Sequence, residues 1–152
     1  MRDEQELPGG NQKYDAVYVI GVFDLFHRGH VELLRRAKEL GNRLIVAIND
    51  DKMVASYKRR PVVYEQDRLA VVKACRYVDD AFLVDSYDNK PLLEQYQVSV
   101  IVHGNDWDHA SYLEQIRVTE EFLEKHNIEM VFLKSTEGIS TTGLIRQIQA
   151  MQ

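Results

Sequence analysis

Short apolar runs alternate with longer amphipathic segments from residue 14 to the end of the chain. The runs are residues 16–21 (AVYVIG), 43–48 (RLIVAI), 81–84 (AFLV), 99–103 (SVIVH) and 129–133 (EMVFL). Each is rich in β-branched or aliphatic side chains and is shorter than a typical helix, so each predicts a buried strand.

The segments between these runs carry apolar residues at helical spacing. Residues 30–40 place Leu33, Leu34 and Ala37 on one face, and Gly41 follows as a C-terminal stop for this helix. Further helices are predicted at residues 64–78, 91–96, 112–126 and 141–151. The segment at 112–126 is expected to form one long amphipathic helix.

This alternation predicts the fold class. Strands that consist of continuous Val, Ile and Leu residues are typical of a parallel sheet that helices cover on both faces. Right-handed crossovers then give a Rossmann-like, doubly wound α/β fold with a five-stranded parallel sheet. We expect one domain over residues 14–152 and a mobile N-terminal lead over the polar residues 1–13. Ligands of such sheets bind beyond the carboxyl ends of the strands, where the strand order reverses.

Composition narrows the class of protein. A chain of 152 residues with 45% hydrophobic residues is long and apolar enough for one globular domain. Its net charge of −5 argues against a protein that coats nucleic acid or inserts into an anionic membrane. Cys75 is the single cysteine, so an internal disulfide is excluded. We expect a cytoplasmic protein with no nucleic-acid partner.

The first strand leads directly into a helix through His27-Arg28-Gly29-His30. Backbone N–H groups and the helix dipole favour a phosphate at such a junction, and Gly29 lets an anion approach the backbone closely. His27 and His30 are three residues apart, so both imidazoles can face one point and donate to phosphate oxygens. Histidine can also take up charge near neutral pH as negative charge develops. One such histidine is usually a cap or a surface residue, but the pair favours an anion site.

Three other segments carry candidate chemistry. Hydroxyls before the last helix, in residues 138–142, can cap that helix and bind phosphate. The basic residues 58–60 form either a solvated loop or a source of charge for a triphosphate. After the fourth strand, Gly104 lets the backbone approach a base whose edge Asn105 and Asp106 could read. Asp24 and Asp51 each follow a strand and could orient a ligand, cap a helix or bind Mg²⁺ through water.

Three of these segments resemble one known family. Residues 21–30 (G-x-F-D-x-x-H-x-G-H) are similar to the signature of the HxGH nucleotidyltransferase superfamily, in the form of its cytidylyltransferase branch. Residues 135–142 (STEGISTT) resemble that branch's RTEGISTT block, and Arg76-Tyr77-Val78-Asp79 resembles its RYVD segment. The resemblance covers residues 14–149, which is most of the chain.

The resemblance implies a nucleotidyltransferase, CTP-dependent, that joins CMP to a phosphorylated alcohol with Mg²⁺ and works as a homodimer. His27, His30 and Lys58 are then the catalytic residues, and Lys58, Lys90 and Asp51 bind the acceptor. The implied nucleotide-binding residues are Gly21, Val22, Phe23, Asp24, Arg28, Gly29, Arg76, Gly104, Asn105, Asp106, Lys134, Ser135, Thr136, Glu137, Gly138, Ile139, Ser140, Thr141 and Thr142.

Two departures and several acceptors keep alternatives open. Val22 replaces the usual threonine, and Ser135 replaces the arginine that opens the RTEGISTT block, with Lys134 one place earlier. These changes favour a non-catalytic nucleotide-binding protein, whereas the intact histidine pair and Lys58 disfavour it. Glycerol 3-phosphate is the first expectation for the acceptor. Phosphoethanolamine, phosphocholine and ATP-dependent adenylyl transfer are the alternatives, and an aromatic cage or negative pocket would favour a cationic head group.

Overall fold

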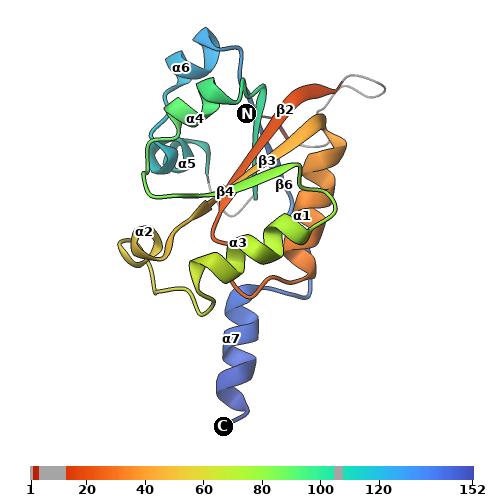
Figure 1. Ribbon diagram of the computed structural model, residues 1–152, viewed down its shortest axis with the longest axis vertical. Coiled ribbons are helices and arrows are strands. Elements are labelled where there is room, and N and C mark those ends of the chain that lie inside the picture. Colours follow the sequence, from red (N-terminus) through yellow and green to blue (C-terminus); the bar gives the residue numbers. More distant parts are fainter. Residues whose placement is uncertain (1, 4–12, 105–107) are drawn as a thin grey trace.

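The computed structural model describes residues 2–3, 13–104 and 108–152. A parallel sheet lies at its centre (Figure 1). The strand order is β1-β6-β5-β2-β3-β4, and all strand pairs are parallel. The strands are β1 (Arg2–Asp3), β2 (Tyr14–Gly21), β3 (Gly41–Asn49), β4 (Asp80–Val84), β5 (Val100–Gly104) and β6 (Glu129–Leu133). The five predicted strands and the doubly wound order are confirmed. The short β1 adds a sixth strand from within the predicted N-terminal lead.

Helices connect these strands and cover both faces of the sheet (Figure 1). They are α1 (Arg28–Glu39), α2 (Asp51–Ala55), α3 (Glu65–Ala74), α4 (Lys90–Gln95), α5 (His109–Ile116), α6 (Glu120–Lys125) and α7 (Thr141–Ala150). α2 was not predicted, and α3 ends four residues before the predicted boundary at residue 78. α7 extends away from the body of the molecule, and none of its residues is buried (Figure 1).

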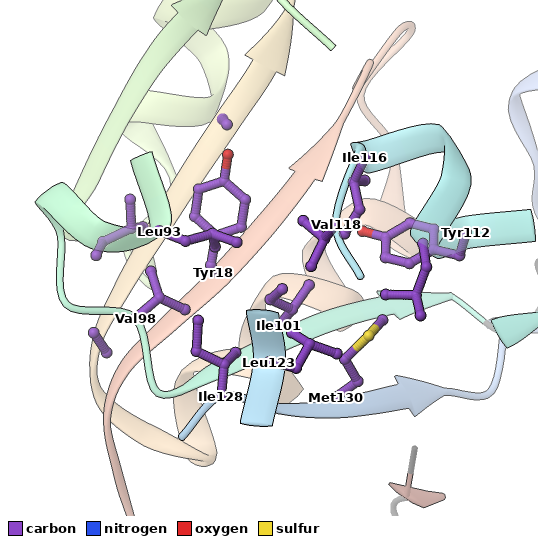
Figure 2. Packing of buried hydrophobic residues seen from close by; sticks show 14 of the residues in the cluster. Tyr18, Leu93, Val98, Ile101, Tyr112, Ile116, Val118, Leu123, Ile128 and Met130 are labelled. Atoms are coloured by element: carbon purple, nitrogen blue, oxygen red, sulfur yellow. The ribbon is translucent and has the colours of Figure 1, made fainter. Parts of the chain in front are cut away.

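Alternate residues of each strand enter two separate core layers, as the two-residue period of a strand requires. On β2, Tyr18 packs with α4, α5 and α6 residues such as Leu93 and Ile116 (Figure 2). Val19 points to the other layer, where Leu34 of α1 and Val72 of α3 are buried. The sheet is therefore buried on both faces, which explains its continuous apolar strands.

The predicted long helix at residues 112–126 is wrong. α5 ends at Ile116, and Arg117 adopts a left-handed conformation with φ 60° before α6 begins. Ile116 and Val118 are both buried, at 2% and 4% exposure. One continuous helix would turn these two residues about 200° apart, so it could not bury both against the same sheet face.

Gly41 has a different role from the predicted helix stop. It opens β3 and is not in the left-handed conformation, which among the described glycines occurs at Gly138. A Cβ atom at Gly41 would lie 2.5 Å from Val17 Cγ2 and 2.7 Å from the carbonyl oxygen of Tyr14. The absence of a side chain therefore allows β3 to approach the start of β2.

We expect a Gly41→Ala substitution to destabilise the fold, because the new Cβ meets backbone that cannot easily move. The expected loss of unfolding free energy is about 1–3 kcal/mol, the usual cost of overpacking. Urea denaturation followed by circular dichroism measures it. The neighbouring Asn42→Ala, at an exposed position, is the control and should stay within about 0.5 kcal/mol of wild type. Equal stability of the two variants would contradict this role for Gly41.

Candidate functional site

A cavity of about 700 Å³ lies at the carboxyl ends of β2 and β3, beside the point where the strand order reverses. This is where doubly wound sheets bind ligands. Residues from β2, α1, the segment after α2, α5 and the start of α7 line it. The sequence predicted the following lining residues: Gly21, Val22, Phe23, Asp24, His30, Lys58, Thr141 and Thr142.

The two histidines of the HxGH segment lie against each other, with ring centroids 3.9 Å apart. The His30 ring lines the cavity. The His27 ring lies behind it, with Nε2 3.3 Å from Thr141 Oγ1 at the start of α7. The pair therefore joins the start of α1 to the start of α7, as the sequence predicted.

Backbone donors determine which nitrogen of each imidazole carries a proton. The Gly29 N–H donates to His27 Nδ1 at 3.0 Å, and the His27 N–H donates to His30 Nδ1 at 3.1 Å. Each Nδ1 is therefore an acceptor, so the proton of each neutral ring is on Nε2. This reciprocal capping box leaves both rings with an Nε2–H that can donate toward the cavity side.

Apolar surroundings keep His30 uncharged. Burial among Phe23 and Phe26, together with the neighbouring His27, lowers its pKa to about 4, although Asp24 opposes the shift. Burial also lowers the pKa of His27. Without a ligand, His30 is therefore a neutral Nε2–H donor, and the uptake of charge as negative charge develops on a phosphate stays a prediction.

The strand end itself is unusually shaped around these rings. Phe23 and Leu25 have left-handed φ angles of 57° and 50°, which non-glycine residues adopt only when their surroundings enforce it. A Cβ atom at Gly21 would lie 3.0 Å from the Phe23 ring. Gly21 therefore leaves room for Phe23 to turn back over the end of β2 and pack on His30.

Asp24 connects the loop after β2 to residues 58–63, which we call the basic segment. It accepts hydrogen bonds from the Val62 and Val63 N–H groups at 2.8 and 2.9 Å and pairs with Arg59 at 3.3 Å. Burial alone would raise the pKa of Asp24, but these donors hold it below its ordinary value. Asp24 thus fixes the segment that brings Lys58 to the cavity.

A second set of contacts next to the cavity comes from Arg68, which is 1% exposed. Its guanidinium donates to the carbonyl oxygens of Val22, Asn49 and Val63 and pairs with Asp51 at 2.7 Å. One side chain thereby connects the ends of β2 and β3 with the basic segment. The Val22 side chain carries no hydroxyl, but its backbone is fixed by this contact.

The start of α7 forms the far wall of the cavity. Ser140 caps the helix by accepting from the Gly143 N–H at 3.0 Å, and Thr141 Oγ1 donates to the Asp24 carbonyl oxygen at 3.1 Å. Gly138 has φ 86°, and the Arg28 guanidinium donates to the adjacent Glu137 carbonyl oxygen at 3.2 Å. Ile139 lies over Gly29, within 3.7 Å of where a Cβ would be. The predicted STEGISTT segment therefore meets the HxGH segment.

Other predicted residues are not brought to the cavity. Arg76 lies near the amino ends of the strands, at the end of the sheet away from the cavity. This position follows from the nearby Asp79, which binds the backbone of Leu44 near the start of β3. Lys90 is directed to the Arg117 carbonyl oxygen and Asp88. The Lys134 carbonyl oxygen accepts from Arg36, on the outside. Gly104 ends β5 beside β2, whereas Asn105 and Asp106 lie outside the described residues.

The cavity also includes residues that the sequence did not suggest. Asn49 ends β3, and Tyr57 follows α2 immediately before Lys58. Tyr112 and Gln115 come from α5. The rule that directs attention to strand ends could have found Asn49, whereas the α5 residues depend on how that helix packs.

The carboxylates do not fit a resident Mg²⁺ site. Mg²⁺ prefers carboxylate oxygens together with substrate phosphates, but Asp24 and Asp51 are already paired with arginines and backbone donors. Over the described ranges, no cluster of three His, Cys, Asp or Glu side chains could hold an ion. Over the same ranges, no helix is long and apolar enough to cross a membrane.

Known proteins are similar to this chain in sequence and fold. The profile of a family described as cytidylyltransferase-like matches residues 18–147. The glycerol-3-phosphate cytidylyltransferase of Staphylococcus aureus is 37% identical over 87% of this chain and 93% of its own length. The ethanolamine-phosphate cytidylyltransferase of Dictyostelium discoideum is 36% identical over 89% of this chain, which spans only 37% of that protein. A lipopolysaccharide core biosynthesis protein from Thermoplasma volcanium has a similar structure, with TM-score 0.65 and 26% identity over 83% of this chain and 99% of its own.

We expect the folding stability to decrease as the pH is lowered, within a window that His30 sets. Its pKa is about 4 in the folded chain against 6.5 for the free side chain, so between these values the unfolded state binds more protons. Stability is complete above pH 6.5 and is lost as the pH falls toward 4. Relative to His30→Asn, wild type should lose on the order of 1 kcal/mol of unfolding free energy between pH 7 and 5.

Urea denaturation at a series of pH values measures this difference. Asparagine keeps an acceptor for the His27 N–H, so the capping contact survives in the variant. His126→Asn, outside the cavity, controls for the loss of a histidine elsewhere. A difference between wild type and His30→Asn that is constant over pH would contradict the assignment.

Proposed function

The chain belongs to the cytidylyltransferase-like family, and on this premise we propose that it joins CMP from CTP to a phosphorylated alcohol, releasing pyrophosphate. The observation that carries the proposal is the convergence of His30, Lys58 and the start of α7 on one cavity, with the His27 ring packed against His30. A non-catalytic nucleotide-binding protein is disfavoured, because the HxGH histidine pair and Lys58 are all present and His30 and Lys58 line the cavity.

In the proposed reaction, an oxygen of the acceptor's phosphate attacks the α-phosphorus of CTP. A new P–O bond forms while the bond to the β-phosphate oxygen breaks, and the electron pair leaves with pyrophosphate. His30 Nε2–H donates to the α-phosphate as its negative charge grows. His27 does the same after exchanging its long contact with Thr141 for a phosphate oxygen. Catalysis is then positioning and charge stabilisation without a covalent intermediate.

Cations and N–H groups hold the rest of the triphosphate in this proposal. Lys58 and the N-terminus of α7 bind the β- and γ-phosphates. Arg28, beside Glu137 and Gly138, supplies the guanidinium that is lost at Ser135. Mg²⁺ accompanies CTP on its phosphate oxygens instead of residing on the chain.

The charges at the cavity favour glycerol 3-phosphate as the acceptor. Asp24 is the one carboxylate among the described lining residues, and Arg59 already neutralises it. The Tyr57 and Tyr87 rings lie edge to face at 6.1 Å, but Lys58 faces one and Arg117 the other, at 5.8 and 5.1 Å. A phosphocholine or phosphoethanolamine cation would therefore meet positive charge where it needs a negative or aromatic surface.

The proposal extends to assembly and location. We propose a homodimer in the cytoplasm formed from a single domain over residues 14–152. Apolar residues on and directly after α7 support a partner surface, since Ile148 of α7 is 49% exposed and Met151, which follows the helix, is 80% exposed. Light scattering that gives a monomeric mass at micromolar concentration would contradict the homodimer.

A substrate panel tests the activity. Pyrophosphate release is measured with CTP, ATP, UTP or GTP against glycerol 3-phosphate, phosphoethanolamine, phosphocholine and sugar phosphates. We expect turnover with CTP and glycerol 3-phosphate to exceed that of every other pair. Preference for ATP would support adenylyl transfer, and absence of turnover with all pairs would support the non-catalytic alternative.

We expect His30→Ala to lower kcat by more than about 100-fold, the scale of losing one oriented transition-state donor. Steady-state pyrophosphate release measures it, with circular dichroism to verify folding. His126→Ala, on a histidine outside the cavity, is the matched control and should keep wild-type kcat. Wild-type turnover by a folded His30→Ala protein would overturn the role of His30.

A further inference from the structure

Asn49 carries a buried, unsatisfied polar atom next to the cavity. It is the last residue of β3, lines the cavity and is only 7% exposed. Its side-chain Oδ1 is buried and accepts no hydrogen bond from any residue in the described part of the chain. A buried carbonyl oxygen without a donor costs about 1–3 kcal/mol, so this atom suits a donor that a ligand brings.

Tyr57 supplies the complementary group. Its hydroxyl oxygen accepts from Asn49 Nδ2 at 3.2 Å, which leaves the O–H proton of this 37% exposed side chain available to a ligand or to water. Burial raises the pKa of Tyr57, so the hydroxyl remains protonated at neutral pH. An available O–H donor and an unused C=O acceptor thus lie side by side on the cavity wall.

This pair matches the chemistry of an alcohol. An aliphatic hydroxyl donates one hydrogen bond and accepts others, whereas an ammonium group only donates and a methyl group does neither. We propose that Asn49 and Tyr57 form a subsite that recognises a free hydroxyl on the acceptor's alcohol portion. The inference rests on the proposed cytidylyl transfer and specifies its acceptor as a polyol phosphate.

The position of Lys58 supports this assignment. Lys58 directly follows Tyr57, and its ammonium lies 5.8 Å from the centre of the Tyr57 ring. An acceptor whose phosphate shares the Lys58 ammonium with the CTP phosphates can direct its short carbon chain along Tyr57 toward Asn49. Asn49 Oδ1 is not accessible to solvent in the structure. The Tyr57 side chain, which is 37% exposed, must therefore move by the width of one hydroxyl to admit the acceptor. Its 3.2 Å contact with Asn49 is at the long limit for a hydrogen bond, so this movement sacrifices little.

Acceptor kinetics test the subsite. kcat and KM are measured with CTP and either glycerol 3-phosphate or n-propyl phosphate, which lacks the free hydroxyls. We expect Asn49→Ala to lower kcat/KM for glycerol 3-phosphate about 10–100-fold, and Tyr57→Phe about 5–10-fold, the range for lost or unpaired hydrogen bonds. The value for n-propyl phosphate should change less than about 3-fold, and the KM for CTP should stay constant.

A matched control and a charge variant sharpen the test. Tyr64→Phe removes a hydroxyl from an exposed tyrosine that does not line the cavity and should change neither acceptor's kinetics. Asn49→Asp adds a carboxylate, so it should shift relative kcat/KM toward phosphoethanolamine by at least about 10-fold.

The outcomes separate the two proposals. Equal losses for both phosphates in Asn49→Ala and Tyr57→Phe would indicate a structural role and overturn the subsite while cytidylyl transfer stands. Unchanged kinetics of both variants with glycerol 3-phosphate would also overturn the subsite while cytidylyl transfer stands. Absence of turnover in the wild-type protein with every acceptor would overturn the proposed function, and the subsite with it.

Discussion

The donation of two backbone N–H groups to two imidazole Nδ1 atoms is the constraint on which the site depends. Gly29 and His27 supply these donors at the start of α1, so the helix cap and the candidate catalytic pair are the same structure. Each ring is thereby held as a neutral Nε2–H donor, and the phenylalanines around His30 keep it uncharged without a ligand. A neutral, oriented donor requires no proton transfer when charge develops on a phosphate.

Two buried charged residues connect this cap to the rest of the cavity. Asp24 holds the basic segment through backbone N–H groups, and Arg68 joins that segment to the ends of β2 and β3. Both side chains are less than 5% exposed. Removing the charged partner of either one, Arg59 for Asp24 or Asp51 for Arg68, would leave a buried charge without compensation. The position of Lys58 is therefore a property of the fold and not of one surface loop.

Sequence patterns predicted what depends on local periodicity and on chain order. The parallel strands, the histidine pair and the start of α7 follow from runs, spacings and the rule for strand ends. The break at Arg117 could not be predicted, because it reflects burial of both Ile116 and Val118 against one sheet face. The positions of long side chains also depend on tertiary packing: Lys90 reaches the Arg117 carbonyl oxygen instead of the cavity, and Arg76 lies near Asp79, which contacts the start of β3. Tertiary packing alone adds Tyr57 and Gln115 to the cavity.

The most direct test of the central claim is ¹⁵N NMR of the histidine side chains at neutral pH, recorded with and without CTP. The account predicts that His27 and His30 carry their proton on Nε2 in the free protein and that CTP shifts these Nε2 resonances while Nδ1 stays unprotonated. A proton on Nδ1 of either ring, a charged His30, or Nε2 resonances that do not respond to CTP would contradict it.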